Sequence, residues 1–374
     1  MKHRPVLALL LVAAVLGLVG SQTAFADPGH GSGNVVFVQS NQPGGNQILV
    51  FHRAGDGQLA PAGTYATGGL GGAALPGTQS DHLASQGSLV FSRRHRLLIA
   101  VNAGSDTVST FRVQGDRLEL ESVVSSGGQF PASVGVHGDI AYVLNSGGTG
   151  IVQGFRVGPD GLTPIAGSAR SLGLANTVPP NFLMSPGQVG FTPDGRQLLV
   201  TTKASTSSID VFQVGNDGRL SATPVVNPSA TPVPFAFTFG PGGQLVSGEA
   251  ATSSVTTYRI DPGGTLADPK SATDGQAALC WIQRVHGFYF VSNTASNDLS
   301  SFTVNPSGQP SLLNAVAATT NAGPIDLAAS GGFLYAETGL AGTVDEFSVA
   351  GNGSLIPLGS VTGLPSGIEG IAAG

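Results

Sequence analysis

The stretch Phe155-Arg156-Val157-Gly158-Pro159-Asp160-Gly161-Leu162 contains the pattern that decides the fold. An aromatic residue is followed by x-Val, then by a Gly-rich turn, and then by a Leu that begins the next strand. Asp-Gly favours the positive φ angles that tight hairpin turns require. The aromatic-x-Val core recurs along the chain, most copies with such a turn, with Arg53 and Ile260 in place of the Val in two copies. Its aromatic residue stands at Phe51, Phe111, Phe155, Phe212, Tyr258, Phe302 and Phe347. Seven copies of one short unit indicate a repeat architecture.

Each unit contains more strands than the one that carries the aromatic residue. An apolar strand ends in a polar residue nine or ten positions upstream, as in Leu97–Asn102 and Ala141–Asn145. A strand of small residues such as Ala132–Val136 precedes it, which suits the crowded centre of a radial array. Each unit therefore supplies four strands in roughly 45 residues, the period of a propeller blade. We predict an all-β fold, a seven-bladed β-propeller with four-stranded blades.

The two ends of the repeat region complement one another. The segment Asn34–Val38 begins a blade that lacks its inner strand, and Gly367–Ala373 is a small-residue strand that lacks a blade. Pairing of these two strands closes the ring and removes exposed strand edges. We expect residues 27–374 to form a single propeller domain.

The N-terminus has the features of an export signal. A basic start (Lys2, His3, Arg4) is followed by the apolar run Val6–Val19 and by Ala24-Phe25-Ala26. This order predicts a signal peptide at residues 1–26, cleaved near Ala26, and hence a secreted or periplasmic protein. No later stretch is apolar enough to span a membrane.

Composition excludes several classes of partner and cofactor. The net charge of −6, with only 10% charged residues, does not indicate a basic surface that would bind nucleic acid. Cys280 is the only cysteine, so the chain has no internal disulfide, and we interpret this thiol as buried and inert. With few His residues and one Cys, the sequence predicts no metal and no cofactor. We expect a monomer with a small-molecule ligand.

Two repeats are longer than the others. One insertion runs from about Thr64 to Ser85 and contains the acid–base pair Asp81-His82, and the other runs from about Ala166 to Ser185 and contains Arg170. Both lie between the outer strand of one blade and the inner strand of the next. Long loops in compact domains are more often functional than accidental, so the face that they share is the candidate site.

Polar residues end the second strands at one equivalent place in every blade, and we expect them to form a ring at the mouth of the central channel. Its members are Asn41 or Gln42, Asn102, Asn145, Lys203, Glu249, Asn293 and Glu337. Asn favours turns, so the Asn members have a structural interpretation as well as a role in orienting ligand hydroxyls. Lys203, Glu249 and Glu337 depart from the Asn pattern. A lysine and two carboxylates around one funnel are able to bind an anionic or hydroxylated molecule, and to supply a general base.

The chain resembles the lactonase-type seven-bladed propellers, the family of 6-phosphogluconolactonase and carboxymuconate cyclase. The hairpin Pro193–Val200, the stretch Val101–Val108 and the repeated Phe-x-Val-x-x-Asp-Gly-x-Leu units carry the resemblance, which covers essentially the whole mature chain. It implies a lactone-type substrate. In active members a blade begins with Pro-Arg-His and a Glu ends its next strand. Pro234 and Glu249 correspond to that pattern, whereas Phe235 and Ala236 occupy the Arg and His positions.

A second family motif has also changed. Pro186-Gly187 stands where the family has Pro-His, and Thr202-Lys203-Ala204 stands where it has Asp-Leu-Gly. Lys203 or Arg170 would replace the lost positive charge only in a different geometry.

Two hypotheses follow. In the first, the protein binds or hydrolyses a small hydroxylated or acidic lactone-type compound at the loop-rich channel mouth, with Glu249 as acid or base and Lys203 as anion contact. It requires Glu249, Lys203 and Glu337 to converge beneath the long loops. In the second, the protein is a non-catalytic extracellular binding module or cell-envelope scaffold. An electron-transfer role is disfavoured, because the sequence has no Cys or His cluster and only one Trp.

Overall fold

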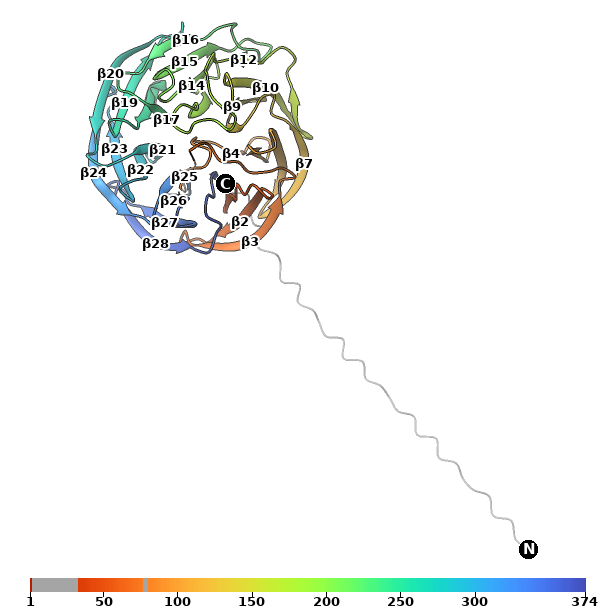
Figure 1. The fold of residues 1–374 in the computed structure, drawn as a ribbon. Helices are drawn as coiled ribbons and strands as arrows, with labels where there is room; N and C mark the ends of the chain where they lie inside the picture. Colours follow the sequence, from red (N-terminus) through yellow and green to blue (C-terminus); the bar gives the residue numbers. More distant parts are fainter. Residues whose placement is uncertain (2–32, 77–79) are drawn as a thin grey trace.

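The computed structural model describes Met1, residues 33–76 and residues 80–374. Apart from Met1, the predicted signal peptide lies outside the described residues. Seven sheets are arranged as blades around a central axis, and their outermost strands, among them β7, β20 and β24, form the rim of the ring (Figure 1). This confirms the predicted seven-bladed, all-β propeller.

Each blade has four strands in antiparallel order, which run from the centre of the ring outward in the order named. Blades 1 and 2 contain β29 (Ile371–Ala373), β1 (Val35–Gln39), β2 (Gln47–Arg53), β3 (Leu59–Ala66); and β4 (Leu89–Ser92), β5 (Leu97–Asn102), β6 (Thr107–Gln114), β7 (Arg117–Ser125). Blades 3 and 4 contain β8 (Pro131–His137), β9 (Ile140–Asn145), β10 (Ile151–Gly158), β11 (Gly161–Pro164); and β13 (Gln188–Phe191), β14 (Gln197–Thr201), β15 (Ser208–Gln213), β16 (Val225–Pro228).

The remaining blades repeat this arrangement. Blades 5, 6 and 7 contain β17 (Pro234–Phe239), β18 (Leu245–Glu249), β19 (Ser254–Ile260), β20 (Leu266–Thr273); β21 (Leu279–Val285), β22 (Phe288–Asn293), β23 (Asp298–Val304), β24 (Pro310–Thr319); and β25 (Pro324–Ser330), β26 (Phe333–Thr338), β27 (Thr343–Val349), β28 (Leu355–Val361). A short strand, β12 (Arg170–Ser171), also pairs with β10, and one 3₁₀ turn, η1 (Pro241–Gly243), precedes β18.

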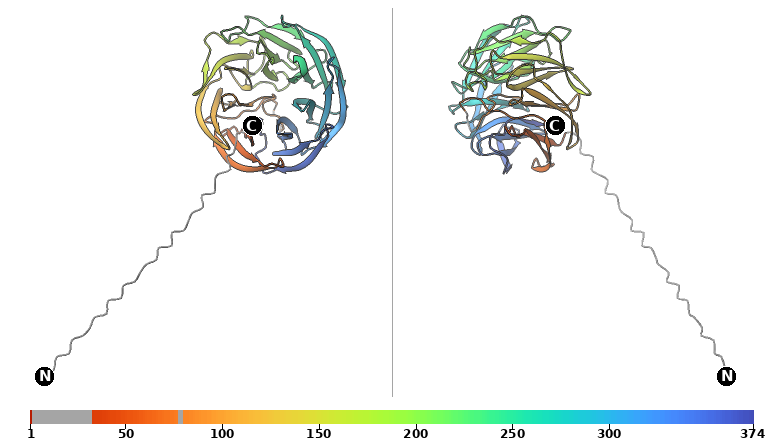
Figure 2. Two further views of the ribbon diagram at one scale, coloured as in Figure 1. Left: turned by 180° about the vertical axis from the view of Figure 1, so that it is seen from behind. Right: turned by 45° about the vertical axis from the view of Figure 1, so that its right-hand side comes forward.

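The ring closes as expected from the two chain ends. The C-terminal strand β29 pairs with β1 in antiparallel register, with Phe37 opposite Ala372. It thereby becomes the inner strand of blade 1, and the C-terminus lies near the centre of the ring (Figure 2). The tail supplies the strand that the first repeat lacks.

Burial between blades explains the continuous apolar runs in the second strands. In β5, Leu97, Ile99 and Val101 pack into the core between blades 2 and 3, whereas Leu98 and Ala100 pack toward blade 1. Alternate side chains of a strand point to opposite faces, so a strand covered on both faces has a continuous apolar run. The aromatic residue of each repeat stands on the third strand and is buried in these cores.

The two long loops extend over the same end of the channel. The first loop (residues 67–88) joins β3 to β4, and the second (residues 172–187) joins β12 to β13. They meet where Leu75 forms a parallel bridge with Asn181. We call this end the loop face and the opposite end, where the turns between first and second strands lie, the hairpin face. In the described part of the chain, no helix is long and apolar enough to cross a membrane.

Candidate functional site

The first long loop enters the central channel and lies across it. Its residues Leu83–Ser88, which we call the plug, contact inner strands or loops of several blades. Trp281 Nε1 on β21 donates to the Ser85 carbonyl at 2.9 Å, and Ser85 Oγ donates to the Ala132 carbonyl on β8 at 2.7 Å. The Gln86 amide N–H donates to the Gly187 carbonyl at 3.0 Å. The plug is therefore held at a fixed place by hydrogen bonds to opposite sides of the ring.

A pair of carboxyl groups lies where the plug begins. Asp81 is joined to Glu369 by a side-chain hydrogen bond, and Glu369 Oε2 accepts the Leu83 amide N–H at 2.5 Å. Burial raises the pKa of Glu369 well above its usual range, and the negative charge of Asp81 raises it further. Burial also raises the pKa of Asp81, although the Lys203 charge and the hydrogen bond from Glu369 oppose this. Two carboxyl groups this close share a proton, and Glu369 carries it.

Lys203 is the positive charge nearest to this pair. Its ammonium group donates to the carbonyls of Ala84 (2.6 Å) and Phe182 (2.5 Å), and it lies 5.0 Å from the centre of the Phe235 ring. Burial lowers the pKa of Lys203 to about 8, while Asp81, Cys280 and Glu369 favour its charged form. Lys203 thus binds both long loops at once and offsets the charge of the carboxyl pair.

His82 lies beside the pair at the loop face. Burial lowers the pKa of its imidazole, whereas Asp81 raises it. The ring packs so closely on Gly367 that a Cβ at that residue would lie 2.0 Å from it. Asp81 and His82 are partly exposed at the loop face, whereas Glu369 is fully buried, so a small molecule at that face would reach the pair through Asp81.

Two further buried carboxyl groups continue from this pair along the channel. Glu337 accepts the Gly370 amide N–H at 2.9 Å through Oε2. Burial raises the pKa of Glu337 well above its usual range, and Asp326 raises it further. Burial raises the pKa of Asp326 to about 7, although backbone N–H groups of Leu327, Gly87 and Ile371 favour its ionised form.

Glu249 lies in a different environment from Lys203. It is fully buried, and its carboxylate accepts hydrogen bonds from Ser229 (2.6 Å), Tyr258 (2.6 Å) and Thr256 (2.6 Å), as well as from Thr231. Burial and the Glu249 charge raise the pKa of Tyr258. Four hydroxyl donors thus occupy the carboxylate, which leaves little capacity for a substrate. Among the described contacts, Glu249 shares none with Lys203 or Glu337.

The other predicted site residues make contacts within the scaffold. Asn102, Asn145 and Asn293 are fully buried and hydrogen-bond to residues of their own or the preceding blade, such as Thr107, Ser126 and Asp298. Arg170 donates to the backbone carbonyls of Leu220 and Ser221 and so fixes the second long loop to blade 4. These contacts hold strand ends and neighbouring loops together, and each of the three Asn residues is the last residue of its strand.

The structure therefore brings together Asp81, His82, Lys203 and Glu337, and it adds one residue that the sequence analysis missed. Glu369 lies in the closing segment Gly367–Ala373, where it is the only charged residue among Gly, Ile and Ala. This isolated charge was the sequence feature that could have identified Glu369 as a site residue. At the family Arg and His positions, Phe235 and Ala236 are buried, and the Phe235 ring lies 4.8 Å from the Trp281 ring. Within the described residues, no group of three or more His, Cys, Asp or Glu is arranged to hold a metal ion.

Comparisons with known proteins agree with this fold. The sequence model of the family "Lactonase, 7-bladed beta-propeller" matches residues 31–283. A solved structure of a Lactobacillus plantarum protein is similar, with a TM-score of 0.72 and 17% identity over 90% of this chain and 98% of that one. The periplasmic gluconolactonase PpgL of Pseudomonas aeruginosa is similar with a TM-score of 0.68 and 20% identity over 90% and 98%. No curated protein matches the chain by sequence.

Proposed function

Because the chain belongs to the lactonase family of seven-bladed β-propellers, we propose that it hydrolyses a small lactone with the carboxyl pair Asp81–Glu369 at the loop face. The observation that carries the proposal is the hydrogen-bonded contact of these two carboxyl groups beside the buried Lys203, which also holds Ala84. A carboxylate and a carboxylic acid in contact provide a base and an acid at neutral pH.

The pair accounts for each proton of the reaction. The Asp81 carboxylate accepts a proton from water as the water oxygen bonds to the lactone carbonyl carbon. When the bond from that carbon to the ring oxygen breaks, Glu369 gives its proton to the departing oxygen, and a hydroxy acid results. The proton on Asp81 then passes to Glu369 across their hydrogen bond, which restores the starting state.

Lys203 is a positioning residue in this scheme. Its ammonium group holds Ala84, three residues after Asp81, and its charge keeps one carboxyl of the pair ionised. Because Lys203 is committed to two backbone carbonyls and Phe235 replaces the family Arg, the described residues of the site offer no free lysine or arginine for a substrate phosphate. We infer a neutral, hydroxylated lactone as substrate.

Hydrolysis of neutral sugar lactones and aliphatic lactones by the purified mature protein tests the proposal. We expect Asp81→Asn and Glu369→Gln each to lower kcat/KM by about 10² or more, as removal of a general base or acid does. Glu249→Gln is the matched control, since it changes a buried carboxylate at the family position and should leave kcat within about twofold if it folds.

If only Glu249→Gln loses lactone hydrolysis, the residue at the family position performs the catalysis. If the folded protein hydrolyses no lactone in the panel, the non-catalytic scaffold is the better description.

One observation favours that second candidate. Leu75, Val178 and Leu183 on the two long loops are about half exposed (49, 51 and 49%), and exposed apolar side chains that gather on one surface mark sites of macromolecular contact. A surface of this kind suits contact with another macromolecule. Retention of the folded protein on the cell envelope, abolished by Leu75→Ser with Leu183→Ser, would support the scaffold role.

We also propose that the protein is exported. The N-terminal pattern supports this, and the similar Pseudomonas protein is described as periplasmic. N-terminal sequencing of protein recovered outside the cytoplasm should begin at or near Asp27, and an intact Lys2–Ala26 segment on that protein would contradict cleavage.

A further inference from the structure

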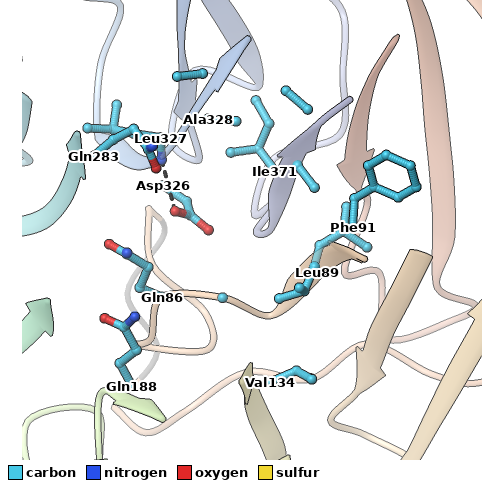
Figure 3. Close-up of a pocket in the computed structure, with 15 residues that line it drawn as sticks. Gln86, Leu89, Phe91, Val134, Gln188, Gln283, Asp326, Leu327, Ala328 and Ile371 are labelled. Atoms are coloured by element: carbon cyan, nitrogen blue, oxygen red, sulfur yellow. Dashed lines mark hydrogen bonds between the residues drawn. The ribbon is translucent and has the colours of Figure 1, made fainter. Parts of the chain in front are cut away.

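A cavity lies in the channel on the side of the plug toward the hairpin face. Its volume is about 300 Å³, and its walls come from β4, β8, β25 and β29 together with Gln86, Gln188 and Gln283 (Figure 3). β25 runs from Pro324 near the loop face to Ser330 at its hairpin, and residues 326–329 of this strand line the cavity. The cavity therefore lies between the plug and the hairpin face, away from Asp81.

Asp326 is the polar group at its centre. Only 3% of the residue is exposed, and Oδ1 accepts the Leu327 amide N–H at 2.9 Å. Amide N–H groups of Gly87 and Ile371 also bond the carboxyl group. Figure 3 shows the carboxyl group directed toward the open space above Gln86. A carboxylate has about four acceptor positions, so one remains for a ligand hydroxyl.

Two glutamine amides are held in place around this space. Gln86 Nε2 donates to the Ile282 carbonyl (3.3 Å), and its Oε1 accepts the Ile282 N–H (3.0 Å). Gln188 makes the same two bonds with Phe237, at 3.2 and 2.6 Å. Each amide nitrogen carries two hydrogens, so each glutamine keeps one N–H for a ligand. Because both ends of each amide are fixed, binding costs little side-chain entropy.

The charge of the residues that line the cavity favours an uncharged ligand over an anion. Among the described residues that line the cavity, Asp326 is the only ionisable side chain, and none of them is a cation. A phosphate or carboxylate would therefore meet a like charge with nothing to offset it, whereas hydroxyl groups can donate to Asp326 and accept from the glutamines. A volume of about 300 Å³ equals roughly ten water molecules and lies at the small end of ligand pockets.

We propose that this cavity is a second binding site, for an uncharged polyhydroxylated molecule of about monosaccharide size. The partial exposure of Gln86, Gln188 and Gln283 leaves it open to solvent. The cavity and the carboxyl pair use different residues, although the charge of Asp81 acts on Asp326, so ligand binding at the cavity is measured separately from lactone hydrolysis.

Isothermal titration calorimetry of the full mature chain with D-glucose and myo-inositol at pH 8, where Asp326 is mostly ionised, tests the proposal, with D-gluconate and glucose 6-phosphate as charged analogues. We expect the neutral compounds to bind at least tenfold more tightly than the charged ones. Asp326→Asn keeps the shape of the side chain but removes the charged acceptor, and it should weaken binding by about tenfold or more.

Two further variants distinguish loss of the ligand site from a general effect on folding. Gln283→Trp fills the partly exposed wall and should abolish binding even if Asp326→Asn is poorly folded. Asp210→Asn is the matched control, because Asp210 is also buried but bonds Ser208 on β15, and binding should be unchanged. The proposal is overturned if no neutral compound binds the folded protein, if the charged analogues bind best, or if binding survives both cavity variants.

Discussion

The Lys203 ammonium group donates a 2.6 Å hydrogen bond to the carbonyl of Ala84, so a residue next to β14 of blade 4 holds a loop that begins in blade 1. The same ammonium group binds Phe182 of the second long loop. One side chain thus connects both insertions that distinguish this propeller from a plain sevenfold repeat.

Replacement of Lys203 should therefore destabilise the protein. Lys203→Met retains much of the packing but leaves the Ala84 and Phe182 carbonyls unpaired and the carboxyl pair without its counter-charge. We expect the free energy of unfolding to fall by about 3 kcal/mol, as when one partner of a buried ion pair is removed. Urea denaturation measures this, with Lys270→Met as control, since Lys270 bonds one carbonyl in an exposed contact. Equal losses in both variants would contradict the role of Lys203.

Gly367 offers a test of how His82 is fixed. Its φ of +75° disfavours any side chain, and a Cβ would also meet the His82 ring at 2.0 Å. Gly363 has a similar φ of +79° with open space around it, so Gly363→Ala measures the backbone cost alone, about 1–2 kcal/mol. We expect Gly367→Ala to cost clearly more in thermal or urea unfolding. Adding His82→Ala to Gly367→Ala should bring the cost back toward that of Gly363→Ala, and no such recovery would mean that the contact with His82 is unimportant.

The pKa of Asp326 predicts a pH-dependent effect on stability. Its folded-state pKa of about 7 lies above the ordinary aspartate value of 3.8, so the folded protein binds this proton more tightly than the unfolded chain. The stabilisation from Asp326 is complete below about pH 4 and is lost as the pH rises through 7. At about 1.4 kcal/mol per unit, the loss is on the order of 4 kcal/mol. Asp326→Asn should therefore raise the melting temperature relative to the native chain more at pH 8 than at pH 4.5.

Glu337 and Asp81 also act on Asp326 and titrate in the same direction. Thermal melts of the native chain, Asp326→Asn and Asp210→Asn at both pH values separate the contribution of Asp326 from theirs. A difference between native and Asp326→Asn protein that does not grow with pH would contradict the prediction.

The sequence repeat made the fold predictable. The site could not be predicted, because its residues come together through contacts between distant parts of the chain. An aromatic residue on each third strand and an apolar second strand are local signals, and they locate the blades and even the closing strand. The partner of Asp81 is not local, because Leu83 and Glu369, whose contact brings the pair together, are 286 residues apart in the chain. Glu249 is the last residue of β18, whereas Lys203 lies two residues beyond the end of β14. The Glu249 side chain is surrounded by hydroxyl groups such as those of Ser229 and Tyr258, while the Lys203 side chain reaches the plug. The direction of a side chain at the end of a strand depends on its neighbours in space.

Trp281 makes the plug observable in solution. It is the only tryptophan in the chain, it is fully buried, and its indole N–H donates to the Ser85 carbonyl at 2.9 Å. In the native protein we therefore expect a blue-shifted emission and little quenching by acrylamide. If Lys203 holds the plug, Lys203→Met should increase quenching and shift the emission to longer wavelength below the unfolding transition, whereas Lys270→Met should do neither. Unchanged fluorescence in a folded Lys203→Met protein would show that the bonds from Trp281, Gln86 and Glu369 suffice to keep the plug in the channel.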